Sequence, residues 1–157
     1  MPYRRDPRLA RPAPQRVDTV RLRASEVPVG FEVPAFERGI TREMARIHAA
    51  PMQNFHTVLE DAQALGYPDI VIAGPMFTCF FAEMFTRCFG EDWITTGDME
   101  FKLVKPVFAN QTIRARAVCA GHEKIGERVK VRLDIWCERH DDGVKTSVGS
   151  ASVTLHP

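Results

Sequence analysis

The sequence predicts an α+β fold in which an antiparallel sheet is wrapped around one long buried helix. Two observations carry this prediction. From Gly74 to Phe89 the chain is apolar around almost the full circumference of a helix, and a helix that is apolar all round is a buried one. From Asp98 onward apolar and polar residues alternate with a period of two, which is typical of strands with one buried and one polar face. The helix and the sheet therefore cover each other.

Size and charge favour one domain without a strongly charged partner. The chain has 157 residues, 45% of them hydrophobic, and 21 basic against 20 acidic residues. The resulting net charge of +1 gives no general attraction to nucleic acid or lipid. No apolar stretch approaches the roughly 20 residues of a membrane span, and the start of the chain lacks the apolar region of a signal peptide. We expect a soluble, cytoplasmic protein with no membrane or nucleic-acid partner.

The first 16 residues differ in composition from the rest. They contain five Arg, one Asp and four of the 11 prolines. Because proline without periodicity supports neither a helix nor a sheet ladder, residues 1–16 are predicted to form a flexible basic arm, with one domain over 17–157. An alternative role for the arm is contact with a phosphate or a neighbouring subunit.

The cysteines predict neither a disulfide framework nor a metal site. No two of them form a C-x-x-C pair, and they are dispersed through the chain as Cys79, Cys88, Cys119 and Cys137. We therefore expect four small, buried apolar residues and no bound metal.

The first predicted strand covers Phe31–Arg38, and Pro34 places it at a sheet edge because proline donates no ladder hydrogen bond. Thr41 is a suitable N-cap for a short helix over Arg42–Ala49. Pro51 ends that helix.

A second short helix is predicted over Leu59–Leu65, with Gly66 at its C-terminal side. The long buried helix begins at Gly74-Pro75, because proline at the first helical position loses no hydrogen bond. Its only charged residues are Glu83 and Arg87, one turn apart, which favours an ion pair between them.

The rest of the chain predicts a meander of four strands. Alternation marks strands around Met99–Leu103, Ile113–Cys119 and Val129–Cys137. Asp142-Gly143 is a hairpin signal, and the last strand is expected over Val144–Leu155.

Several segments, in this order, resemble the MaoC-like (R)-specific enoyl-CoA hydratases and acyl dehydratases. The similarity covers Val29 to Leu155. It is carried by Asn54-Phe55-His56-Thr57, Ala64-Leu65-Gly66-Tyr67, Ile72-Ala73-Gly74-Pro75-Met76, Phe101-Lys102-Leu103-Val104-Lys105-Pro106-Val107, Thr112-Ile113, Asp142-Gly143 and Gly149-Ser150-Ala151.

The resemblance implies a hotdog fold and a hydro-lyase. In that family an acyl thioester, on coenzyme A or a carrier protein, lies in a tunnel at a dimer interface, and water is added across or removed from an α,β double bond. It implies no cofactor beyond the substrate. The expected partner is a second copy of the chain or another hotdog protein.

The resemblance also assigns site residues. His56 takes the position of the family histidine and is expected to act as general acid or base, as an imidazole can near neutral pH. Asn54 would position water or substrate, and His48 would supply a proton or orient water. The Gly74 amide would hold the thioester oxygen, with Pro75 and Met76 beside it in the substrate-binding turn.

One part of the family pattern is absent. The position of the catalytic Asp is occupied by Ala50 or Pro51, depending on register, and neither residue can move a proton. Glu60 and Asp61 are alternative carboxylates, although residues in a first helical turn usually serve the helix dipole.

Two other functions remain open from the sequence. The chain could be an inactive hotdog subunit that binds acyl groups beside an active homologue, or a thioesterase that uses Glu83. Basic side chains on the predicted strands could bind the phosphates of coenzyme A or simply form a solvated face; they are Arg114, Arg116, Arg128, Lys130 and Arg132.

Overall fold

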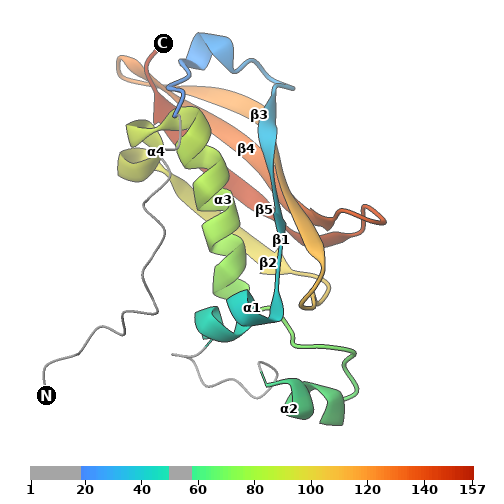
Figure 1. Ribbon diagram of the computed structural model, residues 1–157. Helices are drawn as coiled ribbons and strands as arrows, with labels where there is room; N and C mark the ends of the chain where they lie inside the picture. Colours follow the sequence, from blue (N-terminus) through green and yellow to red (C-terminus); the bar gives the residue numbers. More distant parts are fainter. Residues whose placement is uncertain (1–18, 50–57) are drawn as a thin grey trace, which may run out of the picture.

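The computed structural model describes residues 19–49 and 58–157, so the predicted arm over residues 1–16 lies outside the described residues. The predicted α+β architecture is confirmed: a five-stranded antiparallel sheet curves around the long helix α3 (Figure 1). The elements in chain order are the 3-10 turn η2 (Ala24–Glu26), β1 (Glu32–Gly39), α1 (Arg42–Ala49), α2 (Leu59–Ala64), α3 (Gly74–Phe89), α4 (Glu91–Thr96), β2 (Asp98–Leu103), β3 (Thr112–Ile125), β4 (Arg128–Arg139) and β5 (Lys145–Leu155).

The strand order is β1-β3-β4-β5-β2, which corrects the predicted meander of four strands. Strands β3, β4 and β5 do form a meander, but β2 pairs with β5 and so forms the opposite edge from β1. The chain between β2 and β3 runs beside the segment before α3, where the amide of Ile72 donates to Val107 O at 2.8 Å. Alternation marks a strand but does not encode such a long-range pairing.

The two edges of the sheet differ. Strand β1 contains Pro34, and its register with β3 shifts between Val33 and Phe36, so the predicted edge position of this strand is confirmed. Strand β2 pairs with β5 in continuous register from Asp98 to Leu103. Proline and irregular register are features that discourage further strand pairing, and they occur at the β1 edge only.

Helix α1 has the predicted bounds because its signals are local. The Thr41 hydroxyl accepts the Met44 amide at 3.1 Å and so caps the first turn. Helix α2 ends one residue earlier than predicted, and the chain leaves it through Gly66, whose φ of +85° suits glycine. Two short elements, η2 and α4, were not predicted.

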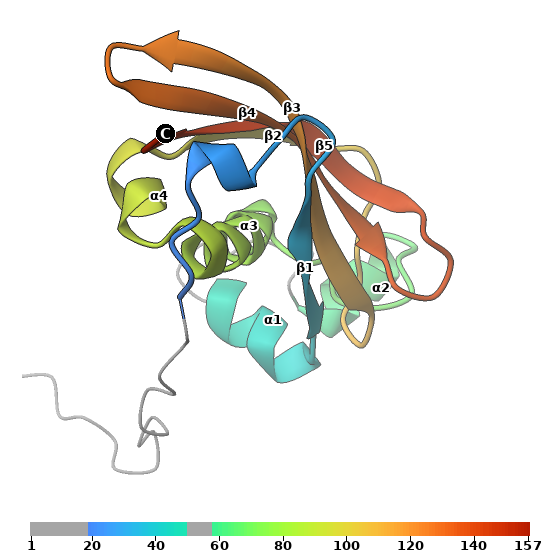
Figure 2. The same ribbon diagram turned by 90° about the horizontal axis from the view of Figure 1, so that it is seen from above.

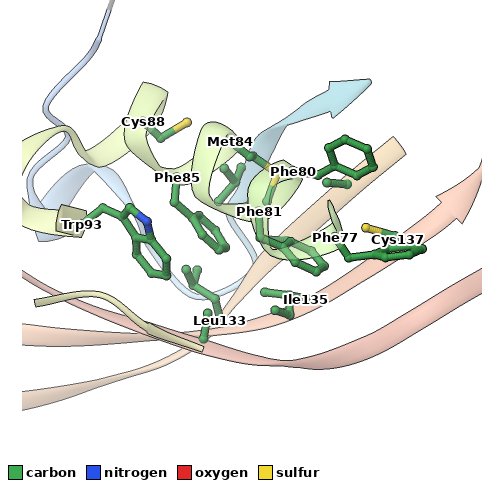
Figure 3. Close-up of a cluster of buried hydrophobic side chains, with 14 of the residues drawn as sticks. Phe77, Phe80, Phe81, Met84, Phe85, Cys88, Trp93, Leu133, Ile135 and Cys137 are labelled. Carbon is green, nitrogen blue, oxygen red and sulfur yellow. The ribbon is translucent and has the colours of Figure 1, made fainter. Parts of the chain in front are cut away.

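The core lies between α3 and the sheet. Phe77, Phe81, Phe85 and Phe89 recur at every fourth position of the helix and are fully buried. Figure 3 shows three of these rings on the side of α3 that faces Leu133 and Ile135 of β4; Phe89 is not labelled there. Burying one such side chain contributes about 1.5–3 kcal/mol, so this row of rings fixes the helix on the sheet.

The prediction that α3 is buried on all sides is wrong. Pro75, Thr78, Cys79 and Arg87 are exposed, and they lie on the face that the sheet does not cover. One curved sheet can enclose only one side of a helix; here β1 and α1 flank part of the other side (Figure 2). The expectation of four buried cysteines is corrected by the same observation, because Cys79 is exposed while Cys88, Cys119 and Cys137 are buried.

Candidate functional site

The first turn of α3 forms one end of the candidate site. Ala73, in extended conformation, precedes Gly74, and Pro75 follows in the first turn as predicted. Gly74 does not have a positive φ; a Cβ there would instead lie 3.4 Å from Leu103 Cδ1. This is an ordinary contact distance, so the end of β2 lies beside this turn without requiring glycine at position 74. The first amides of a helix lack partners within it and carry the positive end of its dipole, so this turn suits an oxygen that gains negative charge.

His48 lies in the last turn of α1 and is half-buried. Its Nε2 atom is shielded from solvent and has no hydrogen-bond partner among the described residues. An unpaired buried polar atom costs about 1–3 kcal/mol. A ligand or a water that bonded to Nε2 would remove that cost, so this atom is a candidate point of contact with a bound molecule.

His48 and Met76 line the same pocket, which has a volume of about 370 Å³. It lies on the open face of α3, between that helix, α1 and the second half of β1. Most of its lining is apolar, with charged groups from Arg38 and Glu83. The lining residues are Phe36, Arg38, Met44, Ile47, His48, Met76, Cys79, Phe80 and Glu83.

The structure thus brings together some of the predicted site residues. His48 and Met76 share the pocket, and Gly74 and Pro75 begin the helix that carries Met76. His56 and Asn54, with Ala50 and Pro51, lie outside the described residues. Their roles therefore stay predictions.

The alternative carboxylates are placed differently. Glu60 and Asp61 are exposed in the first turn of α2, where they serve the helix dipole. Glu83 borders the pocket, but its Oε1 accepts hydrogen bonds from both Nε and Nη2 of Arg87, at 2.8 and 2.6 Å. The predicted ion pair is confirmed. Glu83, the carboxylate that a thioesterase reaction would use, is therefore already bound to Arg87.

Sequence reasoning missed most of the pocket wall. Met44 and Ile47 stand three residues apart on α1, and His48 follows. This spacing places all three on one helix face. It could have been read from the sequence. The contribution of Phe36 and Arg38 could not, because it depends on how β1 passes α3.

The basic residues of the strands are largely paired. Arg114 binds Glu37 at 2.8 Å and Arg116 binds Glu32 at 3.0 Å, while Arg128 binds Asp92 at 2.6 Å. Hydrogen bonds from His140 and then Arg114 lower the pKa of Glu37. Among the five predicted cations, these three are therefore engaged with carboxylates, which favours the interpretation of a solvated face over a phosphate site.

Lys130 and Arg132 border a separate hollow of about 450 Å³ on the outer face of the sheet. The same hollow is bordered by Asp98, Glu100 and Asp134. With three carboxylates beside two cations, it offers no net positive charge to a phosphate.

Cysteine chemistry separates Cys79 from the other three. Burial raises the pKa of the Cys137 thiol to about 12, and it also raises the pKa of Cys88 and Cys119. Since the thiolate is the reactive form, these three are protected by both burial and protonation. Cys79 is the exposed thiol, and it lies on the pocket wall.

The fold and this pocket describe a hotdog protein. No protein-family model and no curated protein matches the sequence. Solved structures do match in fold. A MaoC-like dehydratase from Rhodospirillum rubrum superposes with a TM-score of 0.72 at 12% identity, covering 86% of this chain and 97% of the other. The (R)-hydratase PhaJ1 from Pseudomonas aeruginosa gives 0.69 at 14% identity, covering 87% and 86%.

A third match is the HadBC (3R)-hydroxyacyl-ACP dehydratase complex from Mycobacterium tuberculosis. Its TM-score is 0.62 at 19% identity, with 80% of this chain and 96% of that chain covered. These neighbours confirm the predicted hotdog fold and the resemblance in structure to MaoC-like hydratases and dehydratases. Among the described residues, no helix has the length and apolar character needed to cross a membrane.

Proposed function

We propose that the protein is a hydro-lyase of the MaoC-like type, which adds water to, or removes it from, an α,β-unsaturated or β-hydroxy acyl thioester of coenzyme A or a carrier protein. One observation carries the proposal. His48, whose Nε2 has no hydrogen-bond partner among the described residues, and Met76 in the first turn of α3 line the same mostly apolar pocket. The similarity in fold to hydratases and dehydratases supports the kind of reaction.

The proposed chemistry divides two tasks between the first turn of α3 and the histidines. The thioester oxygen gains negative charge when the α-carbon loses its proton in dehydration, or when water attacks the β-carbon in hydration. The Gly74 amide at the start of α3 would stabilise that charge. His56 would transfer the proton as general acid or base. Asn54 and His48 would hold the water, and the apolar wall would hold the acyl chain. The substrate itself carries the activating thioester, so no further cofactor is required.

The missing carboxylate is consistent with one proton carrier acting alone or with help from His48. General acid–base assistance contributes roughly 100- to 10,000-fold to a rate. We therefore expect the protein to be slower than an enzyme that uses both an Asp and a His.

The direct test is turnover of crotonyl-CoA and longer enoyl thioesters, followed by loss of enoyl absorbance. We expect His56→Ala to lower kcat by about 100-fold or more, within the range for a lost acid or base. His48→Gln should have a smaller effect on kcat. His156→Gln, an exposed histidine near the end of β5, is the matched control and should leave kcat unchanged.

Two outcomes would replace the proposal. Tight binding of acyl thioesters without turnover at any chain length would favour the inactive acyl-binding subunit, the reading suggested by Ala50 and Pro51. Release of free thiol without hydration would favour a thioesterase, and Glu83→Gln would then abolish it.

A further inference from the structure

We propose that the pocket beside α3 binds a short acyl chain that ends in a carboxylate, and that Arg38 binds this carboxylate. The thioester at the other end of the chain is taken from the proposed function, on which this assignment therefore rests. The observation behind it is an arginine that the proposed reaction does not use. Arg38 belongs to the lining of a pocket that is otherwise mostly apolar.

Arg38 lies on the face of β1 that is turned toward the core. Residues that stand opposite each other in neighbouring strands share a face of the sheet, and Arg38 stands opposite the fully buried Ile113 of β3. Phe36, two residues earlier, is on the same face and packs against Phe80 of α3, with ring centroids 6.1 Å apart. A charged side chain on the inner face of a strand usually has a partner that compensates its charge.

No such partner is present in the described part of the chain. Over residues 19–49 and 58–157, no carboxylate lies within ion-pair distance of Arg38, whereas the nearby Arg42 binds Asp69 at 3.0 Å. Glu83 also lines the pocket, but its carboxylate is already bound to Arg87. The guanidinium of Arg38 is therefore available to an anion, and its planar donors match the two oxygens of a carboxylate.

The rest of the lining indicates what kind of molecule carries this carboxylate. Met44 and Met76 line the pocket between the polar groups, so the bound molecule has an apolar middle. Nε2 of His48 is the other polar atom of the pocket without a partner among the described residues. In the proposed function His48 holds the water that reacts at the double bond. An acyl chain with its reacting carbons near His48 and a carboxylate at Arg38 would satisfy both groups.

The position of Arg38 indicates a short chain. Strand β1 runs toward the start of α3 and ends beside it, next to α1 (Figure 1). From Phe36 to Arg38 the strand advances about 7 Å in that direction, and from Phe80 back to Met76 the helix covers about 6 Å. Arg38 is therefore level with Met76, in the turn where the thioester oxygen would bind. A longer chain would carry its end toward the carboxylate of Glu83, two turns further along α3.

The test compares two thioesters that differ only at the last carbon of the acyl chain. Adipyl-CoA ends in a carboxylate and hexanoyl-CoA in a methyl group; both are saturated, so neither can be hydrated during a calorimetric titration. At low ionic strength wild type is expected to bind adipyl-CoA about tenfold more tightly, within the range for one charge-assisted hydrogen bond. The preference should be smaller for sebacyl-CoA over decanoyl-CoA, because of Glu83.

Variants of Arg38 test whether this residue causes the preference. Arg38→Met should reduce the ratio of the two Kd values to about one, Arg38→Lys should keep part of the preference, and Arg38→Glu should reverse it by repulsion. Arg132→Met is the matched control. Arg132 is also an exposed strand arginine without an ion pair among the described residues, but it lies on the outer face of the sheet and should not affect the ratio.

Turnover of enoyl thioesters separates this proposal from the proposed function. Hydration of enoyl thioesters together with equal affinity for adipyl-CoA and hexanoyl-CoA would overturn the carboxylate site and leave the reaction standing. A preference for adipyl-CoA that Arg38→Met removes, without hydration of any enoyl thioester, would support the site and contradict the reaction. An equal loss of affinity for both thioesters in Arg38→Met would show that Arg38 binds a phosphate of coenzyme A, and would overturn the proposal. Failure of wild type to bind either thioester would overturn it as well.

Discussion

Asp92 is a buried carboxylate that two arginines from distant parts of the chain contact. It lies in the first turn of α4 with only 3% of its surface exposed. Its carboxylate binds Arg128 of β4 at 2.6 Å and Arg21, ahead of η2, at 3.2 Å. Burial alone would raise the pKa of Asp92, but the hydrogen bonds from Arg21 and Arg128 outweigh it, so the pKa lies below its ordinary value. One side chain therefore ties three distant segments together.

We expect Asp92→Asn to lower the free energy of unfolding by about 1–3 kcal/mol, because it leaves Arg128 without its buried partner. Urea unfolding at neutral pH measures this. Glu91→Gln is the control. Glu91 also forms an ion pair with Arg21, at 3.5 Å, but both of these side chains are exposed, so its loss should cost little. An equal loss in both variants would contradict the role given to the buried carboxylate.

The same residue predicts a pH dependence. A carboxylate with a lowered folded pKa contributes stability that is complete above its unfolded pKa, about 3.9 for Asp. That contribution is lost as the pH falls through the folded pKa. The stability of wild type should therefore fall towards that of Asp92→Asn below about pH 4. A constant difference between the two proteins down to pH 2 would contradict this assignment.

At the scale of elements, Gly149 controls how closely β2 approaches β5. A Cβ at this position would lie 2.5 Å from Phe101 Cα and closer still to the Glu100 carbonyl oxygen, so there is no room for a side chain. We expect Gly149→Ala to destabilise the protein by about 1–3 kcal/mol, the usual cost of overpacking.

Gly39→Ala is the control, because Gly39 is also in a strand of this sheet and its Cβ would meet Thr112 Oγ1 at an ordinary 3.5 Å. Thermal or urea unfolding of the two variants gives the comparison. If Gly39→Ala lowered the free energy of unfolding more than Gly149→Ala, the close approach of β2 to β5 would not explain the need for glycine at position 149.

The elements also show what a sequence can predict. The bounds of α1 follow from signals within a few residues, such as Thr41 and Pro51. The six residues of α4 carry no apolar periodicity; this helix is fixed by Trp93, whose ring lies 4.5 Å from that of Phe85. The partner of β2 depends on β5, some 50 residues away, and alternation carries no information about it. The lining of the pocket could not be predicted either, because it comes from three separate elements, β1, α1 and α3.

For the whole molecule, the rate at which each thiol reacts measures how well the core is shielded from solvent. One thiol per chain, Cys79, should react rapidly with a disulfide reagent at neutral pH, and the three buried thiols should react only through unfolding. Cys79→Ser should abolish the rapid phase. An acyl thioester bound in the pocket should slow it, because Cys79 lies on the pocket wall. Rapid reaction of two or more thiols in the native protein would show that the core is less closed than described.

The difference between the two sheet edges has a consequence for solubility at high concentration. A sheet that could accept neighbours at both sides would extend into a fibre, since each added chain would offer a fresh side. Here Pro34 and the irregular register make one side a poor template. Strand addition at both sides is therefore blocked at β1, and the protein should stay free of filaments even when it is crowded.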